Sequence, residues 1–454
     1  MSGEPRESAR VHPNLILAVL SLAGLAYAIL SSAVIPALPS FQHSLHTSET
    51  GVTWLLTGFL VSASVGTSII GRLGDMYGKE RLLVWTLMVL AAGTLLAAVS
   101  QSLAMLIVAR VVQGVAGGIF PLAFSIARDE FPTERVAGSI GLMSSILGVG
   151  AGGGLVVGAL ISEHLGWHWL FWIPLPVTLA AAFFTMRYVP ESPVRSPGRV
   201  NWLAATLMSV GVSAVLIAIA QTTLWGWGGA RTLGLFAFGL VFCLAWIAVE
   251  VRSRRPLVDM TMMRIRGVWT TNLAAFLLGA GMYSSFIVFP QFAQLPKSTG
   301  FGFGASAVVS SLYLLPAALT MGLLGTAAGR VARRFGSKSA LVAGTGISAV
   351  AFGFAALGNL IVQAVPPTQT GVASGMNTVM RTLGGALGGQ LAATFIADHV
   401  AHGRPTVTGF TDTYVMATLF LIVCVLAGLL VPQLRAAGRA PALEGHLASA
   451  TETG

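Results

Sequence analysis

Long apolar runs separated by short polar loops decide what this chain can fold into. Each run is about 20 residues long, enough for a helix to cross a bilayer core of about 30 Å. Charged residues make up only 9% of the chain, against about 25% in soluble domains. We therefore expect an all-α polytopic membrane protein. Its predicted spans lie near 14–37, 51–71, 82–101, 103–127, 138–162, 168–188, 201–222, 232–251, 266–290, 304–328, 338–358, 370–397 and 413–432.

Basic residues gather in alternate loops. Loops 128–135, 187–199, 250–256 and 329–338 are rich in arginine, whereas a loop such as 221–230 contains no basic residue. The positive-inside rule places the arginine-rich loops in the cytoplasm. The N-terminus is expected there too, in a multi-pass protein of the cell membrane. The same rule accounts for the net charge of +10 without a nucleic-acid partner.

Short internal echoes divide the chain into two repeated halves. GRLGDMYGKER at 71–81 is echoed by GRVARRFGSKS at 329–339, and PTERVAGS at 132–139 by PTQTGVAS at 367–374. Repeated halves with a site at their interface are a transporter architecture. We expect two six-helix bundles, the second short of a helix, with two extra helices between them. The predicted units are a cytoplasmic tail over 1–13, a first bundle over 14–190, a linker with the extra spans over 191–257, a second bundle over 258–434 and a cytoplasmic tail over 435–454.

The loop 71–81 is unusually charged for this chain. Gly71 and Gly78 permit tight packing and backbone angles that other residues resist. Asp75 requires a partner, either a neighbouring arginine or the positive N-terminus of another helix. The basic residues that hold the loop in the cytoplasm are Arg72, Lys79 and Arg81. On this composition alone, the loop could serve only to set the topology.

These residues resemble the loop between the second and third spans of the major facilitator superfamily. The family pattern is Gly-x-Leu-(Ala/Gly)-Asp-(Arg/Lys)-x-Gly-(Arg/Lys)-(Arg/Lys), from which Met76 and Glu80 depart. The resemblance implies a latch that locks the two halves together in the outward-facing state and releases them during the cycle. Its residues in this chain are Gly71, Arg72, Asp75, Gly78, Lys79 and Arg81.

The fourth span carries a second resemblance to that superfamily. Its run LIVARVVQGVAGG (106–118) matches the family's arginine followed by glutamine and glycine. Arg110 lies about 10 Å inside the membrane at 1.5 Å per residue. Its side chain could snorkel outward, but a charge inside a membrane costs a few kcal/mol and marks a functional site. With Gln113 one turn away, we expect Arg110 to act in substrate or proton handling.

The fifth span carries a third resemblance. Gly150, Gly154 and Gly158 share one helix face and allow another helix to approach closely. The run GLVVGA (154–159) resembles the Gly-Pro-x-x-Gly-Gly motif of drug antiporters but lacks its proline and last glycine. Together with WHWLFWIPLP (167–176) and the two extra spans, it is similar to the fourteen-span drug/proton antiporter branch.

Carboxylates are scarce at membrane depth. Members of that branch commonly carry an aspartate in the first span, where this chain has Leu30. The carboxylates left as candidate proton sites are Glu163 and Asp398, at the outer ends of spans, which could equally be solvated helix ends, and Asp75. The arginines Arg110 and Arg381 favour a neutral or anionic substrate over a dication.

Aromatic and soft side chains could line a substrate site, although most such residues in a membrane bundle face lipid or their neighbours. The candidates are Tyr27, Phe59, Met282, Tyr283, Phe286 and Tyr313.

The resulting hypothesis is a monomeric secondary transporter that exports drugs or secondary metabolites by proton antiport. Its partners would be a small-molecule substrate, the proton and the lipid bilayer. We expect no enzyme activity, cofactor or metal, because no His, Cys or Asp cluster and no nucleophile with a base lies at membrane depth. The alternatives are an impaired relic of such an exporter and a transporter for an anionic metabolite.

The second half is shorter than the first. Glu163 follows Asp75 by 163 − 75 = 88 residues, whereas Asp398 follows Arg333, the residue that echoes Asp75, by 398 − 333 = 65. The difference, 88 − 65 = 23, is about one transmembrane helix. Either residues 338–365 dip into the membrane and return, or the C-terminal tail lies outside. We predict thirteen crossings, with a single span over 338–358 and weak or absent transport.

Overall fold

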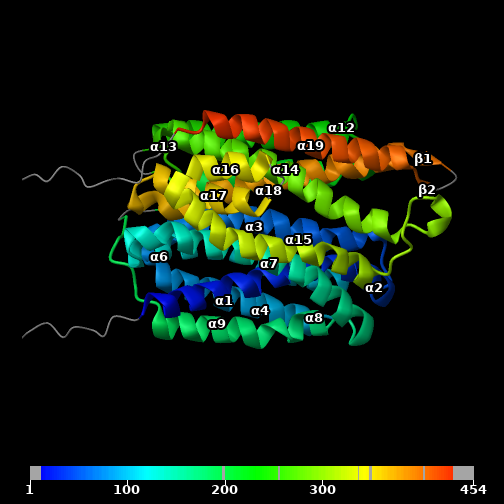
Figure 1. Ribbon diagram of the computed structural model, residues 1–454, viewed down its shortest axis with the longest axis horizontal. Helices are drawn as coiled ribbons and strands as arrows, with labels where there is room; N and C mark the ends of the chain where they lie inside the picture. Colours follow the sequence, from blue (N-terminus) through cyan, green and yellow to red (C-terminus); the bar gives the residue numbers. More distant parts are fainter. Residues whose placement is uncertain are drawn as a thin grey trace, which may run out of the picture.

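The computed structural model describes residues 12–196, 200–253, 256–335, 337–346, 350–401 and 404–432. Its helices lie side by side along the long axis of the molecule (Figure 1). Ten helical segments among these residues are long and apolar enough to cross a membrane. The all-α polytopic fold is therefore confirmed. Most of the two predicted cytoplasmic tails, residues 1–11 and 433–454, lies outside the described residues.

The first half consists of six helical segments. Two of them begin where a serine hydroxyl accepts a hydrogen bond from the first turn, Ser48 from the Gly51 amide and Ser102 from the Met105 amide. The segments are α1 (Pro13–Ser32) continued by α2 (Leu38–Ser44), α3 (Glu49–Tyr77), α4 (Lys79–Ala98), α5 (Leu103–Val115) continued by α6 (Ile119–Glu130), α7 (Thr133–His164), and α8 (Trp169–Trp172) with α9 (Pro174–Tyr188).

Two extra crossing helices follow the first half. They are α10 (Trp202–Ala220), whose first turn is capped by Asn201, and α12 (Ala230–Arg252). The short helices α11 (Thr222–Trp225) and α13 (Met260–Arg264) flank α12. Helix α10 packs against both α3 and α18, which belong to different halves. The extra pair therefore lies beside the boundary between the halves.

The second half contains α14 (Arg266–Gln294), α15 (Ala307–Phe335), α16 (Ser337–Gly346), α17 (Val350–Ala364), α18 (Thr370–Asp398) and α19 (Val407–Leu430). The two-residue strands β1 (Val400–Ala401) and β2 (Arg404–Pro405) pair antiparallel between α18 and α19, with Val400 opposite Pro405.

The prediction of one span over 338–358 is wrong. Helices α16 and α17 have 10 and 15 residues, which at 1.5 Å per residue gives about 15 Å and 22 Å, too short to cross a bilayer core of about 30 Å. They pack against each other and against α15. The segment thus dips in and returns, so the missing length corresponds to the distal parts of two spans rather than to one whole span.

The chain returns to its starting end after α19. The carbonyl oxygens of Leu429 and Leu430 accept hydrogen bonds from Lys338 Nζ (2.7 Å) and Arg266 Nε (3.2 Å), at the starts of α16 and α14. In Figure 1 the last turn of α19 and the first turn of α1 lie at the same end of the molecule as α6 and α13. Because α16 and α17 do not form a full crossing, the number of crossings between loop 329–338 and the C-terminal tail is even. The prediction of thirteen crossings is therefore wrong.

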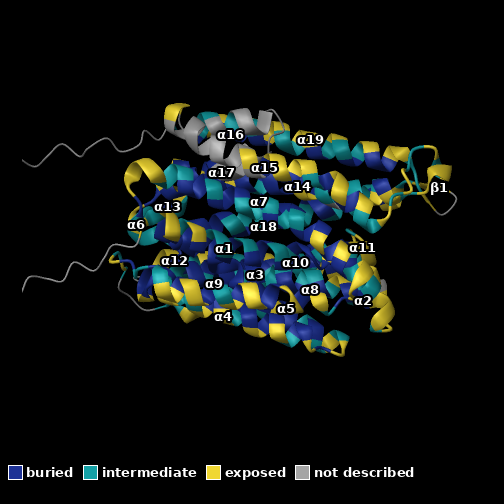
Figure 2. Ribbon diagram, turned by 60° about the horizontal axis from the view of Figure 1, so that its bottom comes forward, coloured by how far each residue is buried: buried dark blue, intermediate teal, exposed yellow. Residues whose placement is uncertain are grey.

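Two helix pairs make the most extensive contacts between the halves. Helix α3 packs against α18, and α7 packs against α15. The internal echoes relate these pairs, because α7 and α18 begin within the echo of 132–139 by 367–374, while α3 and α15 end within that of 71–81 by 329–339. Buried residues concentrate on α3, α7 and α18 (Figure 2), whereas on α12, α15 and α19 the described residues are more often exposed than buried.

Candidate functional site

Asp75 connects the two halves. Its carboxylate, on α3, accepts hydrogen bonds of 3.2 Å from the backbone amides of Gly371 and Val372, in the first turn of α18. The residue is 1% exposed. Of the two partners expected from the sequence, the structure supplies the helix N-terminus, where the partial positive charge of the helix favours an anion. We call this end of the molecule the Asp75 end.

The backbones of α3 and α18 touch beside this carboxylate. A Cβ atom on Gly71 would collide with the carbonyl group of Gly371, and a Cβ on Gly371 would collide with the carbonyl oxygen of Gly71. One turn further along, Gly375 lies against the backbone of Thr67. These small residues allow α18 to come close enough for its amides to reach Asp75.

The basic residues of the loop contact the first half and the linker instead of the second half. Lys79 forms an ion pair with Asp129 at the end of α6, and both side chains are buried. The Ser192 hydroxyl donates to the same Asp129 carboxylate. Arg72 Nη1 donates to Ser196 Oγ at 3.2 Å. The linker after α9 therefore lies on this loop and ties it to α6.

Gly78 has a specific conformational role. Its φ angle is +118°, a region that side chains with a Cβ rarely adopt, and a Cβ there would also collide with the Glu191 carboxylate. Glu191 accepts a 3.4 Å bond from the Glu80 amide and lies 3.7 Å from Arg81 Nε. Arg81 is 71% exposed, so this ion pair contributes little.

Two further contacts near the Asp75 end were not predicted from the sequence. Arg128 Nη1, on α6, donates to Thr370 Oγ1 at the start of α18, with a distance of 2.8 Å. Gln369 donates to Asp259, which precedes α13, at 3.3 Å. Burial opposes ionisation of Asp259, but hydrogen bonds from Thr261 and Gln369 hold the pKa of its carboxyl below the ordinary value. Only the arginine-rich character of loop 128–135 pointed to this region.

Arg110 points into the protein and is fully buried, so it does not snorkel. Its Nη1 atom donates to the Leu30 carbonyl at 3.0 Å and to Gln113 Oε1 at 2.8 Å, and Nε donates to the Leu55 carbonyl at 3.3 Å. Its guanidinium carbon lies 4.1 Å from the centre of the Phe59 ring. Thus Arg110 and Gln113 do meet, and the arginine links α1, α3 and α5 through neutral acceptors.

Residues from both halves converge around Tyr27. Its ring stacks on Phe59, with 5.8 Å between centroids. It interacts electrostatically with Arg110 of its own half and with Tyr283 on α14 and Arg381 on α18. We call Tyr27, Phe59, Arg110, Tyr283 and Arg381 the central cluster. Sequence reasoning named each of these residues, and the structure brings them together.

The accessibility of the cluster differs between its members. Tyr283 is 37% exposed and Arg381 is half-buried, whereas Tyr27 is 9% exposed. The cluster is thus less covered on the side of the second half. Phe286, one turn from Tyr283, is also half-buried, while Met282 is buried and Tyr313 packs against Phe289 and Phe303.

The three glycines of α7 face α1. A Cβ on Gly150 would collide with Ala28, one on Gly154 with Ser32 and one on Gly158 with the Ala33 carbonyl. The neighbouring glycines of α7 serve another face. The residues that pack against Met321 and Ala318 of α15 are Gly148 and Gly152. Helix α7 therefore uses one glycine face within its half and another between the halves.

Glu163 and Asp398 lie neither at the Asp75 end nor in the central cluster. Both are exposed, Glu163 one residue before the end of α7 and Asp398 at the end of α18. These ends are opposite the Asp75 end, because α18 begins beside Asp75. The structure places both carboxylates in the position of solvated helix ends.

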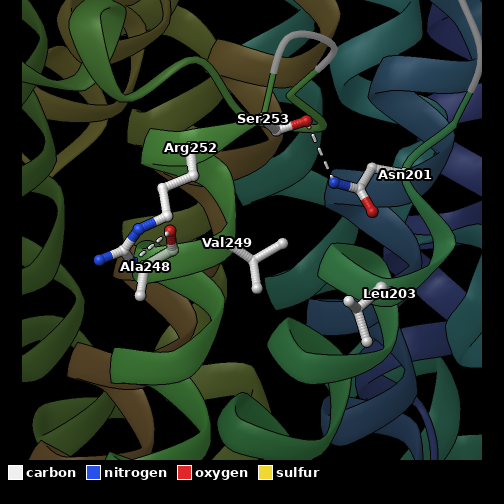
Figure 3. Close-up of a pocket in the computed structure, with 6 residues that line it drawn as sticks. All are labelled: Asn201, Leu203, Ala248, Val249, Arg252 and Ser253. Carbon is white, nitrogen blue, oxygen red and sulfur yellow. Dashed lines mark hydrogen bonds between the residues drawn. The ribbon is translucent and has the colours of Figure 1, made fainter.

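A cavity of about 310 Å³ opens between α10 and α12 near the linker. Figure 3 shows its lining, in which Arg252 Nη1 donates to the Ala248 carbonyl at 3.3 Å and Asn201 Nδ2 donates to Ser253 Oγ at 3.3 Å. Its other lining residues are Leu203 and Val249. It lies on the extra helices and includes no member of the central cluster.

Comparison with known proteins gives consistent matches. Residues 20–361 match the family model of the Major Facilitator Superfamily. The tetracenomycin C resistance and export protein of Streptomyces glaucescens is 27% identical over 435 residues, covering 88% of this chain and 79% of that protein. Multidrug resistance protein 3 of Bacillus subtilis is 29% identical over 265 residues, covering 58% of this chain. That match spans 51% of the Bacillus protein, about half its length.

Solved structures share the fold. The human organic anion transporter MFSD10 has a TM-score of 0.63 at 16% identity, over 94% of this chain and 100% of that one. The proton:xylose symporter XylE has a TM-score of 0.61 at 14% identity, over 93% of this chain and 97% of that one. The family model covers well over half of the chain, and a pseudo-symmetric pair of helical halves meets around the central cluster. The chain therefore belongs to the major facilitator superfamily, a family of multi-pass membrane transporters rather than enzymes.

Proposed function

We propose that this protein exports drugs or secondary metabolites from the cytoplasm by proton antiport. The names of its relatives support export, since they include a tetracenomycin C resistance and export protein and a multidrug resistance protein. The arginine-rich loops support a cytoplasmic Asp75 end, which carries the N-terminus. The substrate binds at the central cluster.

The observation that carries the proposal is the convergence of the two halves on one partly exposed cluster. Tyr27 and Arg110 come from the first half, Tyr283 and Arg381 from the second. At the Asp75 end the halves are held together by the bonds from Gly371 and Val372 to Asp75. A site between halves that are closed at one end is the geometry of alternating access. We assign this state as outward-facing.

Asp75 is the group through which protons act on the halves. As a carboxylate it accepts two backbone amides at the start of α18 and benefits from the helix dipole. Protonation removes that charge and weakens the closure of the Asp75 end. Glu163 and Asp398 are exposed and lie outside the contact between the halves, so we assign this role to neither.

An efflux assay tests the proposal. Cells that lack their own exporters and express the chain are loaded with fluorescent drugs of negative, neutral and positive charge, with and without a protonophore. We expect energy-dependent efflux of at least one dye that the protonophore abolishes, and none from cells that carry an empty vector. Efflux that survives collapse of the proton gradient would contradict antiport.

A second candidate is an impaired exporter, favoured by the short α16 and α17. These helices leave the second half without the distal parts of two spans. In that case the chain reaches the membrane at normal abundance but no dye leaves the cells faster than from the vector control.

A further inference from the structure

The two extra crossing helices touch near their middles and separate toward the linker. A Cβ atom on Gly211 of α10 would collide with the backbone nitrogen and Sγ of Cys243 on α12, so the two helices are in close contact there. The cavity of Figure 3 begins at Leu203, which precedes Gly211 by 211 − 203 = 8 residues, or about 12 Å at 1.5 Å per residue. The cavity is therefore the gap that opens where the helices separate.

This gap, which we call the α10–α12 groove, has a polar edge and apolar walls. At the edge, Asn201 Nδ2 donates to Ser253 Oγ at 3.3 Å, and Arg252 borders the groove next to Ser253 (Figure 3). Leu203 and Val249 line the part that lies further from the helix ends. Polar groups at one end and apolar groups beyond them match a phospholipid, whose headgroup and acyl chains follow one another along the bilayer normal.

The polar edge lies at the level of a membrane surface. Helices α10 and α12 are both long and apolar enough to cross a membrane. Asn201 caps the first turn of α10, and Arg252 is the last residue of α12. Trp202, beside Asn201, is 63% exposed, and tryptophan is enriched where the lipid headgroups begin. Lipid headgroups are therefore the groups that meet this edge in a bilayer.

Arg252 has a charge that the described part of the chain does not balance. It forms no ion pair among the described residues, and its Nη1 donates to the uncharged Ala248 carbonyl at 3.3 Å. That bond keeps the guanidinium beside the last turn of α12, whereas a snorkelling arginine extends toward water. Glu250 is buried and accepts the amides of Leu257 and Val258 instead. The other N–H donors of the Arg252 guanidinium can therefore serve an acceptor outside the chain.

We propose that the α10–α12 groove binds an anionic phospholipid, with its phosphate on Arg252 and an acyl chain between Leu203 and Val249. Arginine binds phosphate through two parallel hydrogen bonds. A zwitterionic lipid brings its own cation, which offsets the attraction of Arg252, whereas an anionic lipid keeps a net negative charge. The site is separate from the central cluster, and the proposal does not depend on the direction or the coupling of transport.

Two lipids with the same acyl chains test the charge preference. The purified full-length chain is freed of lipid in detergent and titrated with dioleoylphosphatidylglycerol, an anion, or with dioleoylphosphatidylcholine, a zwitterion. Native mass spectrometry measures the dissociation constant of the first lipid that binds. We expect phosphatidylglycerol to bind at least about tenfold more tightly, the scale of a hydrogen bond to a charged group.

Substitutions then locate the site. Arg252→Gln should weaken phosphatidylglycerol binding by about tenfold, whereas Arg252→Lys should retain most of it. Val249→Phe fills the apolar part of the groove and leaves Arg252 in place, and it should weaken binding as well. Arg231→Gln is the matched control, because it removes the same charge from an exposed position at the other end of α12. A monodisperse size-exclusion profile separates a binding defect from a folding defect.

Several results would overturn the proposal. Equal affinity for the two lipids would contradict the charge preference. Phosphatidylglycerol binding that Arg252→Gln leaves unchanged, or that Arg231→Gln weakens equally, would mean that Arg252 holds no particular lipid. Binding that Val249→Phe leaves unchanged would place the lipid outside the groove. A dimer of the chain that Val249→Phe dissociates would assign the groove to a second copy of the protein.

Discussion

Two buried charged residues, Asp75 and Arg110, are held by neutral dipoles. Asp75 accepts backbone amides of α18, and Arg110 donates to backbone carbonyls of α1 and α3. Hydrogen bonds to an ionised group are stronger than neutral ones. However, backbone dipoles move with their helices, so such bonds break when the helices separate. Asp75 is therefore suited to a protein whose halves change their contacts, whereas the bonds of Arg110 lie within the first half.

Asp75→Asn should slow turnover without weakening substrate binding. Asparagine keeps the size of the side chain but replaces the charge that the N-terminus of α18 attracts. The measurements are the initial efflux rate in cells and the dye affinity of the purified protein. Glu163→Gln, which neutralises an exposed carboxylate, is the control. A loss of affinity with an unchanged rate per bound dye would rule out a latch role.

Arg110→Ala should abolish efflux while the amount of protein in the membrane stays normal. The substitution removes a buried charge of the central cluster and the bond to Gln113. Efflux and membrane abundance are measured on the same cells, the latter by immunoblot. If a well-expressed variant transports like the wild type, Arg110 has only a structural role.

At the scale of helices, glycine spacing decides which helices touch. Helix α7 carries glycines toward α1 and toward α15, while Gly153 between them has open space around the position of a Cβ. The halves meet through glycines again at α3 and α18. Close helix contacts in a membrane depend on packing rather than on the hydrophobic effect. The glycines therefore set the distances on which the polar contacts depend.

Adjacent positions on α7 provide a matched pair of variants. Gly154→Val places a branched side chain against Ser32 and the backbone of α1, so it should destabilise the protein by about 1–3 kcal/mol, the usual cost of overpacking. Gly153→Val should be nearly neutral. Thermal unfolding in detergent, followed by intrinsic tryptophan fluorescence, compares the two. Equal losses of stability would contradict the assignment of the packed face.

At the scale of the whole molecule, α16 and α17 keep the number of membrane crossings after loop 329–338 even. Backbone that turns within lipid must be covered by neighbouring helices, because lipid offers it no hydrogen bonds. Residues 356–362 of α17 are buried against those neighbours. Helix α18 therefore starts at the Asp75 end, and α19 finishes there.

Cysteine accessibility tests this topology. In a chain with Cys243 and Cys424 replaced by alanine, single cysteines are introduced as Tyr77→Cys, Leu430→Cys and Val400→Cys, all at exposed positions. A membrane-impermeant maleimide should label Val400→Cys on intact cells and the other two only after permeabilisation. Labelling of Leu430→Cys on intact cells would reinstate a full crossing over residues 338–365.

The sequence by itself determined the helices and the family. A run of about 20 apolar residues in lipid must satisfy its backbone internally, so its helical state follows from local composition. The glycine spacing of α7 and the charged loop at 71–81 were likewise readable, because the motif residues lie on successive turns of one helix or within one short segment. The members of the central cluster were named individually from their chemistry, but their mutual contact was not predictable from any spacing.

Only the tertiary structure decided which residues Asp75 and Arg110 contact. The amides that bind Asp75 lie 296 and 297 positions away in the chain, and Arg110 reaches across 80 positions to Leu30. The same holds for residues 338–365, since an apolar run has the same composition whether it crosses the membrane or turns back within it. What decides is whether other helices cover the turning backbone, and that depends on contacts between segments far apart in the sequence.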